Sequence, residues 1–181
     1  MTPAQAEGPS PAVFLDRDGT IMHDVDYCSD PNAIELFDGV IDALQKLKKA
    51  GFKLFVVTNQ SGIGRGYFTE REYRAVESEL NRKLGTDLID ATYFCSDAPG
   101  KNSRRRKPAP EMVLEARRDH DLDLNRSFFV GDKAIDMECG RNAGVKTVLV
   151  RTGYGHSEKF APDLTAETLA DAAEIILKQQ R

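Results

Sequence analysis

The chain has 181 residues, of which 40% are hydrophobic and 30% charged, a composition typical of a globular protein with one substantial domain. No apolar stretch approaches the roughly 20 residues that span a bilayer, and residues 1–11 lack the apolar centre of a secretory signal, so we expect a cytoplasmic protein without a membrane segment. The formal net charge of −4 argues against nucleic acid as a partner.

The first predicted strand, at residues 12–15, follows a Pro-rich segment at 1–11 that we expect to be a disordered tail. Two acidic residues, Asp16 and Asp18, follow the strand and precede Gly19. Side chains two apart on an extended segment point the same way, so both acids can face one reaction centre. An acidic strand-to-turn junction without catalysis is the alternative for this pattern on its own.

The rest of the chain, up to residue 181, alternates amphipathic and short apolar patterns. The amphipathic patterns predict helices at residues 40–50, 69–84, 110–120, 134–143 and 169–178, the second opened by a capping box. The apolar runs predict strands at residues 54–57, 91–94, 128–130 and 147–150, and the glycine-rich residues 62–66 read as a flexible rim. This alternation predicts a single α/β domain at 12–181, a three-layer doubly wound parallel sheet without a large cap domain.

Every predicted strand except the last is followed by polar residues that a simple turn would not require. They include Asp16 and Asp18 after the first strand, Thr58 after the second, Lys107 after the third and Asp132 after the fourth. The carboxyl ends of parallel strands meet at one edge of a sheet, so these side chains should surround one pocket. Carboxylates alone would repel a phosphate, and the oxygen-rich set therefore favours Mg²⁺ together with a phosphate.

In these stretches the chain resembles the haloacid-dehalogenase-like phosphatase superfamily. Within it the chain is most similar to the group of D-glycero-D-manno-heptose 1,7-bisphosphate 7-phosphatases and histidinol-phosphatases. The resemblance rests on Asp-Arg-Asp-Gly-Thr at 16–20, Val-Thr-Asn-Gln-Ser-Gly-Ile at 57–63, Arg-Lys-Pro at 106–108 and Val-Gly-Asp-Lys at 130–133. It implies an aspartyl-phosphate mechanism in which Asp16 is the nucleophile and Asp18 the general acid/base.

The resemblance also implies roles for other residues. Thr58 and Lys107 would hold the phosphoryl group, and Asp16, the backbone carbonyl of Asp18 and Asp132 would bind Mg²⁺. Substrate contacts are implied for Asp24, Val25, Asp26, Tyr27, Asn59, Gln60, Ser61, Arg106 and Lys133. The alternatives are that the loop at 24–27 is only solvated and that residues 59–61 satisfy backbone groups in the turn. Asp136 is expected to support the metal ligand from the second shell, or else to lie in solvent.

One feature of many heptose bisphosphatases, a zinc loop with the pattern Cys-x-His and then Cys-x-Cys, is changed in this chain. Cys95 is kept, but Asp97 stands at the histidine position, and Ser103 and Arg105 stand where the paired cysteines would be. One thiol cannot complete a tetrahedral zinc site, so we predict no structural zinc.

The predicted function is a Mg²⁺-dependent phosphomonoesterase acting on a small phosphorylated metabolite, with a heptose 1,7-bisphosphate as the expected substrate. The arginine-rich rim suits a second anionic group, which favours a bisphosphate. Histidinol phosphate is the main alternative, and a polynucleotide 3′-phosphate comes third. A non-catalytic binding protein on the same fold and phosphotransfer to an acceptor other than water are further alternatives. We expect a monomer or a weak homo-oligomer.

Overall fold

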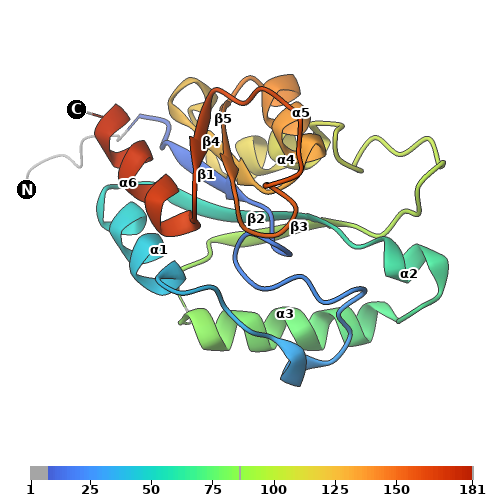
Figure 1. The fold of residues 1–181 in the computed structure, drawn as a ribbon. Helices are drawn as coiled ribbons and strands as arrows, with labels where there is room; N and C mark the ends of the chain where they lie inside the picture. The colour runs from blue at the N-terminus through green and yellow to red at the C-terminus, as the bar shows by residue number, and fades with distance from the viewer. Residues whose placement is uncertain (1–7, 86, 181) are drawn as a thin grey trace, which may run out of the picture.

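The strands predicted from the sequence form one parallel sheet with helices on both faces, which confirms the fold class (Figure 1). The computed structural model of the chain describes residues 8–85 and 87–180. The sheet has the order β3-β2-β1-β4-β5-β6. Its strands are β1 (Ala12–Leu15), β2 (Lys53–Asn59), β3 (Ala91–Cys95), β4 (Phe128–Gly131), β5 (Lys146–Val150) and β6 (Leu164–Ala166).

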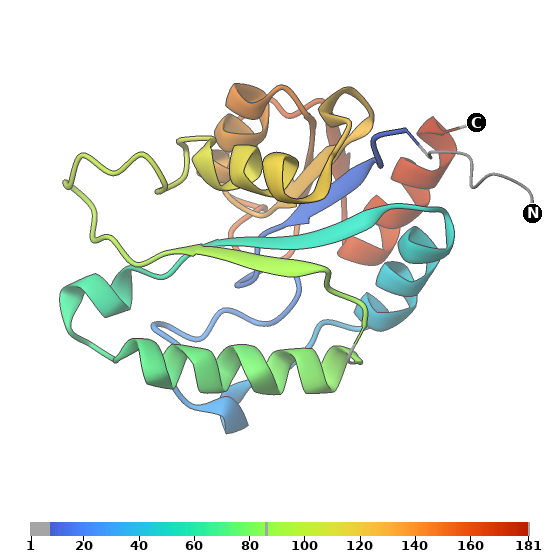
Figure 2. The ribbon, with the colours of Figure 1, turned by 180° about the vertical axis from the view of Figure 1, so that it is seen from behind.

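The helices cover the sheet in two layers, as the opposite views in Figures 1 and 2 show. The helices are α1 (Val40–Lys49), α2 (Ser61–Arg65), α3 (Glu70–Leu84), α4 (Glu111–His120), α5 (Ala134–Ala143) and α6 (Leu169–Gln179), with short 3-10 helices η1 (Pro31–Ala33) and η2 (Leu124–Arg126). α1, α3 and α6 pack on one face, and α4 and α5 pack on the other. The predicted capping box at the start of α3 is present, because the Glu72 N–H donates to Thr69 Oγ1.

The central strands bury apolar side chains on both faces. In β1, Val13 and Leu15 contact the layer of α1 and α6, whereas Ala12 and Phe14 face the layer of α4 and α5. All four residues are fully buried. This arrangement explains why β1 is continuously apolar in the sequence, since no face of the strand meets water.

The order of the strands places a switch point between β1 and β4. The chain continues from β1 to β2 on one side, and β4 pairs with β1 on the other side. The crevice at the carboxyl ends of such strands is the usual ligand site of an open parallel sheet. In this chain Asp16 follows β1 and Asp132 follows β4, so the two acids enter the same crevice.

Besides the short helices η1 and η2, the sequence patterns missed one α-helix and one strand. Most of the flexible rim predicted at 62–66 is instead part of the helix α2. Glycine disfavours helices, but Gly62 and Gly64 occur here because their positions leave no room for a side chain. A Cβ at Gly62 would lie 2.1 Å from the Phe68 ring, and one at Gly64 would lie 2.4 Å from a backbone oxygen of Ser96. β6 has only three residues and gives little periodic signal.

The predicted tail at residues 1–11 lies only partly within the described residues. Most of it, residues 1–7, lies outside the described residues. Ser10 and Pro11, however, are held by backbone hydrogen bonds: the Ser10 N–H donates to Asp121, and the Pro11 carbonyl accepts from Lys53. None of the helices in the described residues is both long and apolar enough to cross a membrane.

Candidate active site

Five of the predicted site residues lie buried together at the carboxyl edge of the sheet. Asp16 follows β1, Thr58 ends the buried part of β2, and Asp132 follows β4, whereas Lys107 enters from the loop before α4 and Asp136 from the first turn of α5. Each of the five residues is at most 5% exposed. We call Asp16, Lys107, Asp132 and Asp136 the carboxylate centre.

Lys107 is the cation of the carboxylate centre. Its Nζ donates to Asp16 Oδ1 and to the Val57 carbonyl, each at 2.8 Å, and lies 2.7 Å from Asp136 Oδ1. Burial by itself lowers the pKa of the Lys107 ammonium, but the charges of Asp136 and Asp16 outweigh it, and the pKa lies above its ordinary value. Lys107 is therefore a permanent positive charge beside the predicted nucleophile.

Three carboxylates of the centre can approach one cation. Asp16, Asp132 and Asp136 each offer an oxygen, and these oxygens lie within 4.8 Å of one another. Burial, and after it the negative charge of Asp16, raises the pKa of Asp132 to about 7. Asp132 Oδ1 is buried without a hydrogen-bond partner among the described residues, so this oxygen suits a metal ligand. The donor set fits a hard divalent cation such as Mg²⁺.

Asp136 has less freedom to bind a metal. Its Oδ2 accepts a hydrogen bond from the Lys133 N–H at 3.1 Å, and its Oδ1 is paired with the Lys107 ammonium. Burial, followed by the charge of Asp16, raises its pKa. The side chain thus connects α5 to Lys107, which fits the supporting role expected for it.

A loop after β5 completes the support of Asp132, and sequence reasoning missed it. The Tyr154 N–H donates to Asp132 Oδ2 at 2.9 Å, and the Thr152 hydroxyl donates to the Gly19 carbonyl at 2.7 Å. Gly19 and Gly153 have φ of +82° and +53°, and a Cβ on either would lie 2.2 Å from Asp132 Oδ2. The two glycines at 153 and 155, directly after a predicted strand, were the available signal.

Asp18 is placed by a turn rather than by an extended strand. β1 ends at Leu15, and the Ile21 N–H donates back to the Arg17 carbonyl, so the alternation assumed for Asp16 and Asp18 does not extend beyond the strand. The Asp18 carboxylate accepts hydrogen bonds from the Arg17 guanidinium at 3.0 Å and from Gln60 Nε2 at 3.0 Å. Arg17 is only 2% exposed, and sequence reasoning gave it no role.

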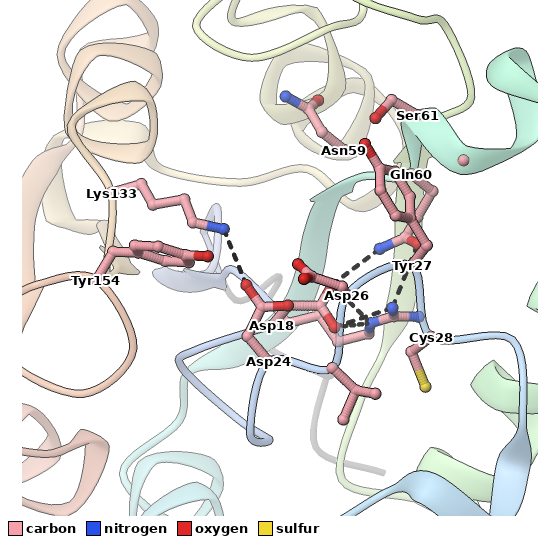
Figure 3. A pocket seen from close by; sticks show the side chains of 13 residues that line it. Asp18, Asp24, Asp26, Tyr27, Cys28, Asn59, Gln60, Ser61, Lys133 and Tyr154 are labelled. Atoms are coloured by element: carbon pink, nitrogen blue, oxygen red, sulfur yellow. Dashed lines mark hydrogen bonds and ion pairs between the residues drawn. The ribbon is translucent and has the colours of Figure 1, made fainter. Parts of the chain in front are cut away.

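A polar pocket of about 220 Å³ lies between the loop at 24–28, residues 59–62 and the pair Lys133 and Tyr154 (Figure 3). Its wall contains eight of the nine predicted substrate residues, all except Arg106. The wall also contains residues that were not predicted to contact the substrate, among them Arg17, Cys28 and Tyr154. The lining is Arg17, Asp18, Asp24, Val25, Asp26, Tyr27, Cys28, Asn59, Gln60, Ser61, Gly62, Lys133 and Tyr154.

Asn59 and Gln60 in the wall have protein partners for their side chains. Asn59 accepts a hydrogen bond from the Lys107 N–H at 3.0 Å and donates to the Lys107 carbonyl at 3.2 Å. Gln60 donates to Asp18 and to Thr58 Oγ1 and accepts from Arg17. Asn59 thus satisfies backbone groups of Lys107 rather than those of its own turn, and Gln60 orients the side chains of Asp18 and Thr58.

The basic loop between β3 and α4 is held by its own contacts. Arg106 donates to the Asp97 carbonyl at 3.0 Å, and Arg105 pairs with Glu115 at 3.0 Å. Cys95 Sγ lies 3.5 Å from Ser103 Oγ. The arginines expected to face a second anionic group are thus engaged within the loop and with α4.

The fold and this site define a haloacid dehalogenase-like hydrolase, and the chain belongs to that family: the family profile matches residues 19–150. This result confirms the resemblance found in the sequence. The D-glycero-beta-D-manno-heptose-1,7-bisphosphate 7-phosphatase of Salmonella typhi is 42% identical to the chain, and that of Escherichia coli K12 is 43% identical. Both alignments cover 94% of this chain, and they cover 97% of the Salmonella protein and 96% of the Escherichia coli protein. The crystal structure of D,D-heptose 1,7-bisphosphate phosphatase from B. bronchiseptica, complexed with magnesium and phosphate, superposes with a TM-score of 0.86 at 30% identity, covering 93% of this chain and 99% of that one.

Proposed function

We propose that this chain is a Mg²⁺-dependent phosphatase that removes the 7-phosphate of D-glycero-β-D-manno-heptose 1,7-bisphosphate. The substrate is inferred from relatives that share more than 40% identity over nearly the whole chain. The observation that carries the chemistry is the burial of Asp16, Asp132 and Lys107 in one contact group at the switch point of the sheet. Loss of Asp16, Asp18 or Lys107 would favour a binding protein, and all three are present.

The carboxylate centre would hold Mg²⁺ through Asp16, Asp132 and the backbone carbonyl of Asp18. The bound ion supplies positive charge that offsets the repulsion between the carboxylates and the phosphate. The unpartnered Asp132 oxygen and the heptose phosphatase neighbour complexed with magnesium both support this assignment. The ion pairs of Lys107 with Asp16 and Asp136 would keep the Asp16 carboxylate oriented.

The reaction proceeds through the two acids of the first motif. An Asp16 carboxylate oxygen attacks phosphorus, the bond to the sugar oxygen breaks, and Asp18 delivers its proton to the leaving alkoxide. Asp18 then takes a proton from water, which attacks the aspartyl phosphate and releases inorganic phosphate and Asp16. The hydrogen bonds of Asp18 with Arg17 and Gln60 hold its carboxyl group in the pocket wall for both transfers.

Thr58 would donate to an oxygen of the transferring group, and Lys107, whose three donors are engaged by Asp16, Val57 and Asp136, would act on that group through its charge. Thr58 Oγ1 accepts a hydrogen bond from Gln60, which leaves its own proton to donate to a phosphoryl oxygen. Lys107 contributes a fixed positive charge next to Asp16. Because both groups are positioned before the substrate binds, little reorganisation is needed as charge develops on the phosphoryl oxygens.

Histidinol phosphate is the second candidate substrate, and one observation favours it. The pocket wall has three carboxylates, those of Asp18, Asp24 and Asp26, while Arg105 and Arg106 are engaged elsewhere. An acidic wall suits the cationic end of an amino alcohol better than a second phosphate. It also suits the hydroxyl groups of a sugar, which donate to carboxylates.

The decisive experiment compares turnover of the two anomers of heptose 1,7-bisphosphate, histidinol phosphate and a 3′-phosphorylated oligonucleotide, measured as release of inorganic phosphate. We expect the β-anomer of the bisphosphate to have the highest kcat/KM and the oligonucleotide the lowest. Activity should disappear with chelator and in Asp16→Asn. A clear preference for histidinol phosphate would overturn the substrate, and no phosphate release from any of the four would favour a binding protein.

We further propose that residues 12–181 act as a single domain in the cytoplasm, as a monomer or weak homo-oligomer, without nucleic acid, membrane or structural zinc. The chain's net charge of −4 and the replaced cysteines support this description. Sedimentation equilibrium tests the oligomeric state, and metal analysis of protein purified without chelator tests for zinc. One zinc ion per chain would contradict the proposal.

A further inference from the structure

Lys133 and Tyr154 form one side of the pocket, across from Gln60 and Ser61 (Figure 3). Lys133 directly precedes α5, and Tyr154 comes from the loop after β5. The Lys133 Nζ lies 4.6 Å from the centroid of the Tyr154 ring and 3.3 Å from an oxygen of Asp24. The ammonium is therefore held between the face of an aromatic ring and a carboxylate.

Lys133 is the cation that an anionic substrate meets in this pocket. Among the described residues that line it, the cations are Arg17 and Lys133. Arg17 is 2% exposed, and its guanidinium is bonded to Asp18 and Gln60, whereas the Lys133 side chain is 30% exposed. The wall otherwise carries carboxylates, so a phosphate oxygen needs the charge of Lys133 close by.

The position of this ammonium depends on groups outside its own side chain, because a lysine stem is flexible. The backbone of Lys133 is fixed by the hydrogen bond from its N–H to Asp136. The backbone of Tyr154 is also fixed, because its N–H donates a hydrogen bond to Asp132. Two residues earlier in the same loop, the Thr152 hydroxyl donates to the Gly19 carbonyl. The ring is thus anchored to the carboxylate centre itself and can place the ammonium relative to it.

We propose that Tyr154 is a positioning residue that holds the Lys133 ammonium where it binds a phosphate oxygen of the substrate. The inference rests on the proposed phosphatase function and adds to it a residue of the β5–β6 loop. The interaction uses the face of the ring, so phenylalanine can replace tyrosine, whereas an aliphatic side chain of similar size cannot. The effect falls on substrate affinity, since neither residue contacts Asp16 or Asp18 through a side-chain hydrogen bond in the described structure.

The experiment uses Tyr154→Leu and Tyr154→Phe, each alone and combined with Lys133→Met. KM and kcat are measured with heptose 1,7-bisphosphate, and the Kd of inorganic phosphate is measured by calorimetry with Mg²⁺ present. We expect Tyr154→Leu to raise KM and the phosphate Kd about 5- to 20-fold with kcat within about threefold, and Tyr154→Phe to stay within about twofold. In the Lys133→Met background Tyr154→Leu should have no further effect.

An equal increase in KM in both backgrounds would overturn the proposal, because it would show that the ring acts without Lys133. Unchanged KM and phosphate Kd in Tyr154→Leu would overturn it as well. Lys146→Met is the matched control: it removes an ammonium 5.9 Å from the Phe128 ring outside the pocket and should leave both constants unchanged. If the unaltered protein does not hydrolyse the bisphosphate, the proposed function fails, and the Kd ratios for inorganic phosphate still decide the role of Tyr154.

Discussion

The carboxylate centre and the wall of the polar pocket are built differently. The residues of the centre are at most 5% exposed, and Asp16 and Asp132 directly follow the central strands β1 and β4. The wall is formed mainly by turns and loops, and Tyr27 and Tyr154 in it are 44% and 49% exposed. The comparison indicates that the rigid sheet provides the phosphoryl-transfer chemistry, while exposed loops determine which molecule reaches it.

The largest expected effect is at the centre. Lys107→Met leaves Asp16 and Asp136 buried without their cation, so we expect kcat to fall about 10³-fold and the free energy of unfolding to fall by about 3–5 kcal/mol. Steady-state kinetics and urea unfolding measure the two quantities. Lys46→Met, which removes a surface partner of Glu174, is the control and should leave turnover unchanged. Turnover near normal in Lys107→Met would remove this residue from the catalytic set.

The next effect tests the contact between the loop after β5 and the centre. In Gly153→Ala the added Cβ collides with Asp132 Oδ2, so we expect Mg²⁺ affinity to fall about 10- to 100-fold, as measured by titration of activity with Mg²⁺. Gly144→Ala is the matched control, because Gly144 also has a positive φ but nothing lies within 4 Å of its Cβ position. Equal Mg²⁺ affinities in the two variants would contradict the steric argument.

A smaller effect is expected in the wall, at Gln60. Gln60→Ala removes the hydrogen bonds to Asp18 and Thr58, so we expect kcat to fall about 10-fold while KM changes by less than about twofold. The pH profile of kcat provides a second measurement, because the variant alters the surroundings of Asp18, the proposed general acid. An increase in KM with kcat unchanged would instead show that Gln60 binds substrate directly.

The last prediction concerns stability rather than turnover, and it is the pH dependence of the metal-free protein. The pKa of Asp132 is about 7 in the folded chain and close to 3.8 when unfolded, so the folded state holds a proton that the unfolded state has released. The free energy of unfolding should therefore fall as the pH rises from about 4 to about 7, by no more than about 1.4 kcal/mol per pH unit. Asp132→Asn should reduce this slope, and an identical slope in the variant would contradict the prediction.

The parts that could be predicted from sequence are those with a local signal. β1 was predicted with its observed limits, because four apolar residues before an acidic turn mark a buried strand. The capping box at Thr69 marked the start of α3 in the same way. Gly62 and Gly64 misled the prediction at α2, because their role is to let Phe68 and the backbone after β3 approach closely, and this cannot be read from neighbouring residues.

The sequence by itself determined that the chain has a parallel sheet, with Asp16, Thr58 and Asp132 at strand ends and Lys107 in the loop after the third strand, since apolar runs and the polar residues that follow them are local features. Only the tertiary structure decided that Arg17 and Gln60 orient Asp18, and that the loop after β5 brings Tyr154 against Asp132 and Lys133. The physical reason is distance along the chain. Thr152 and Gly19, for example, are separated by 133 residues, and no local pattern encodes a hydrogen bond between them.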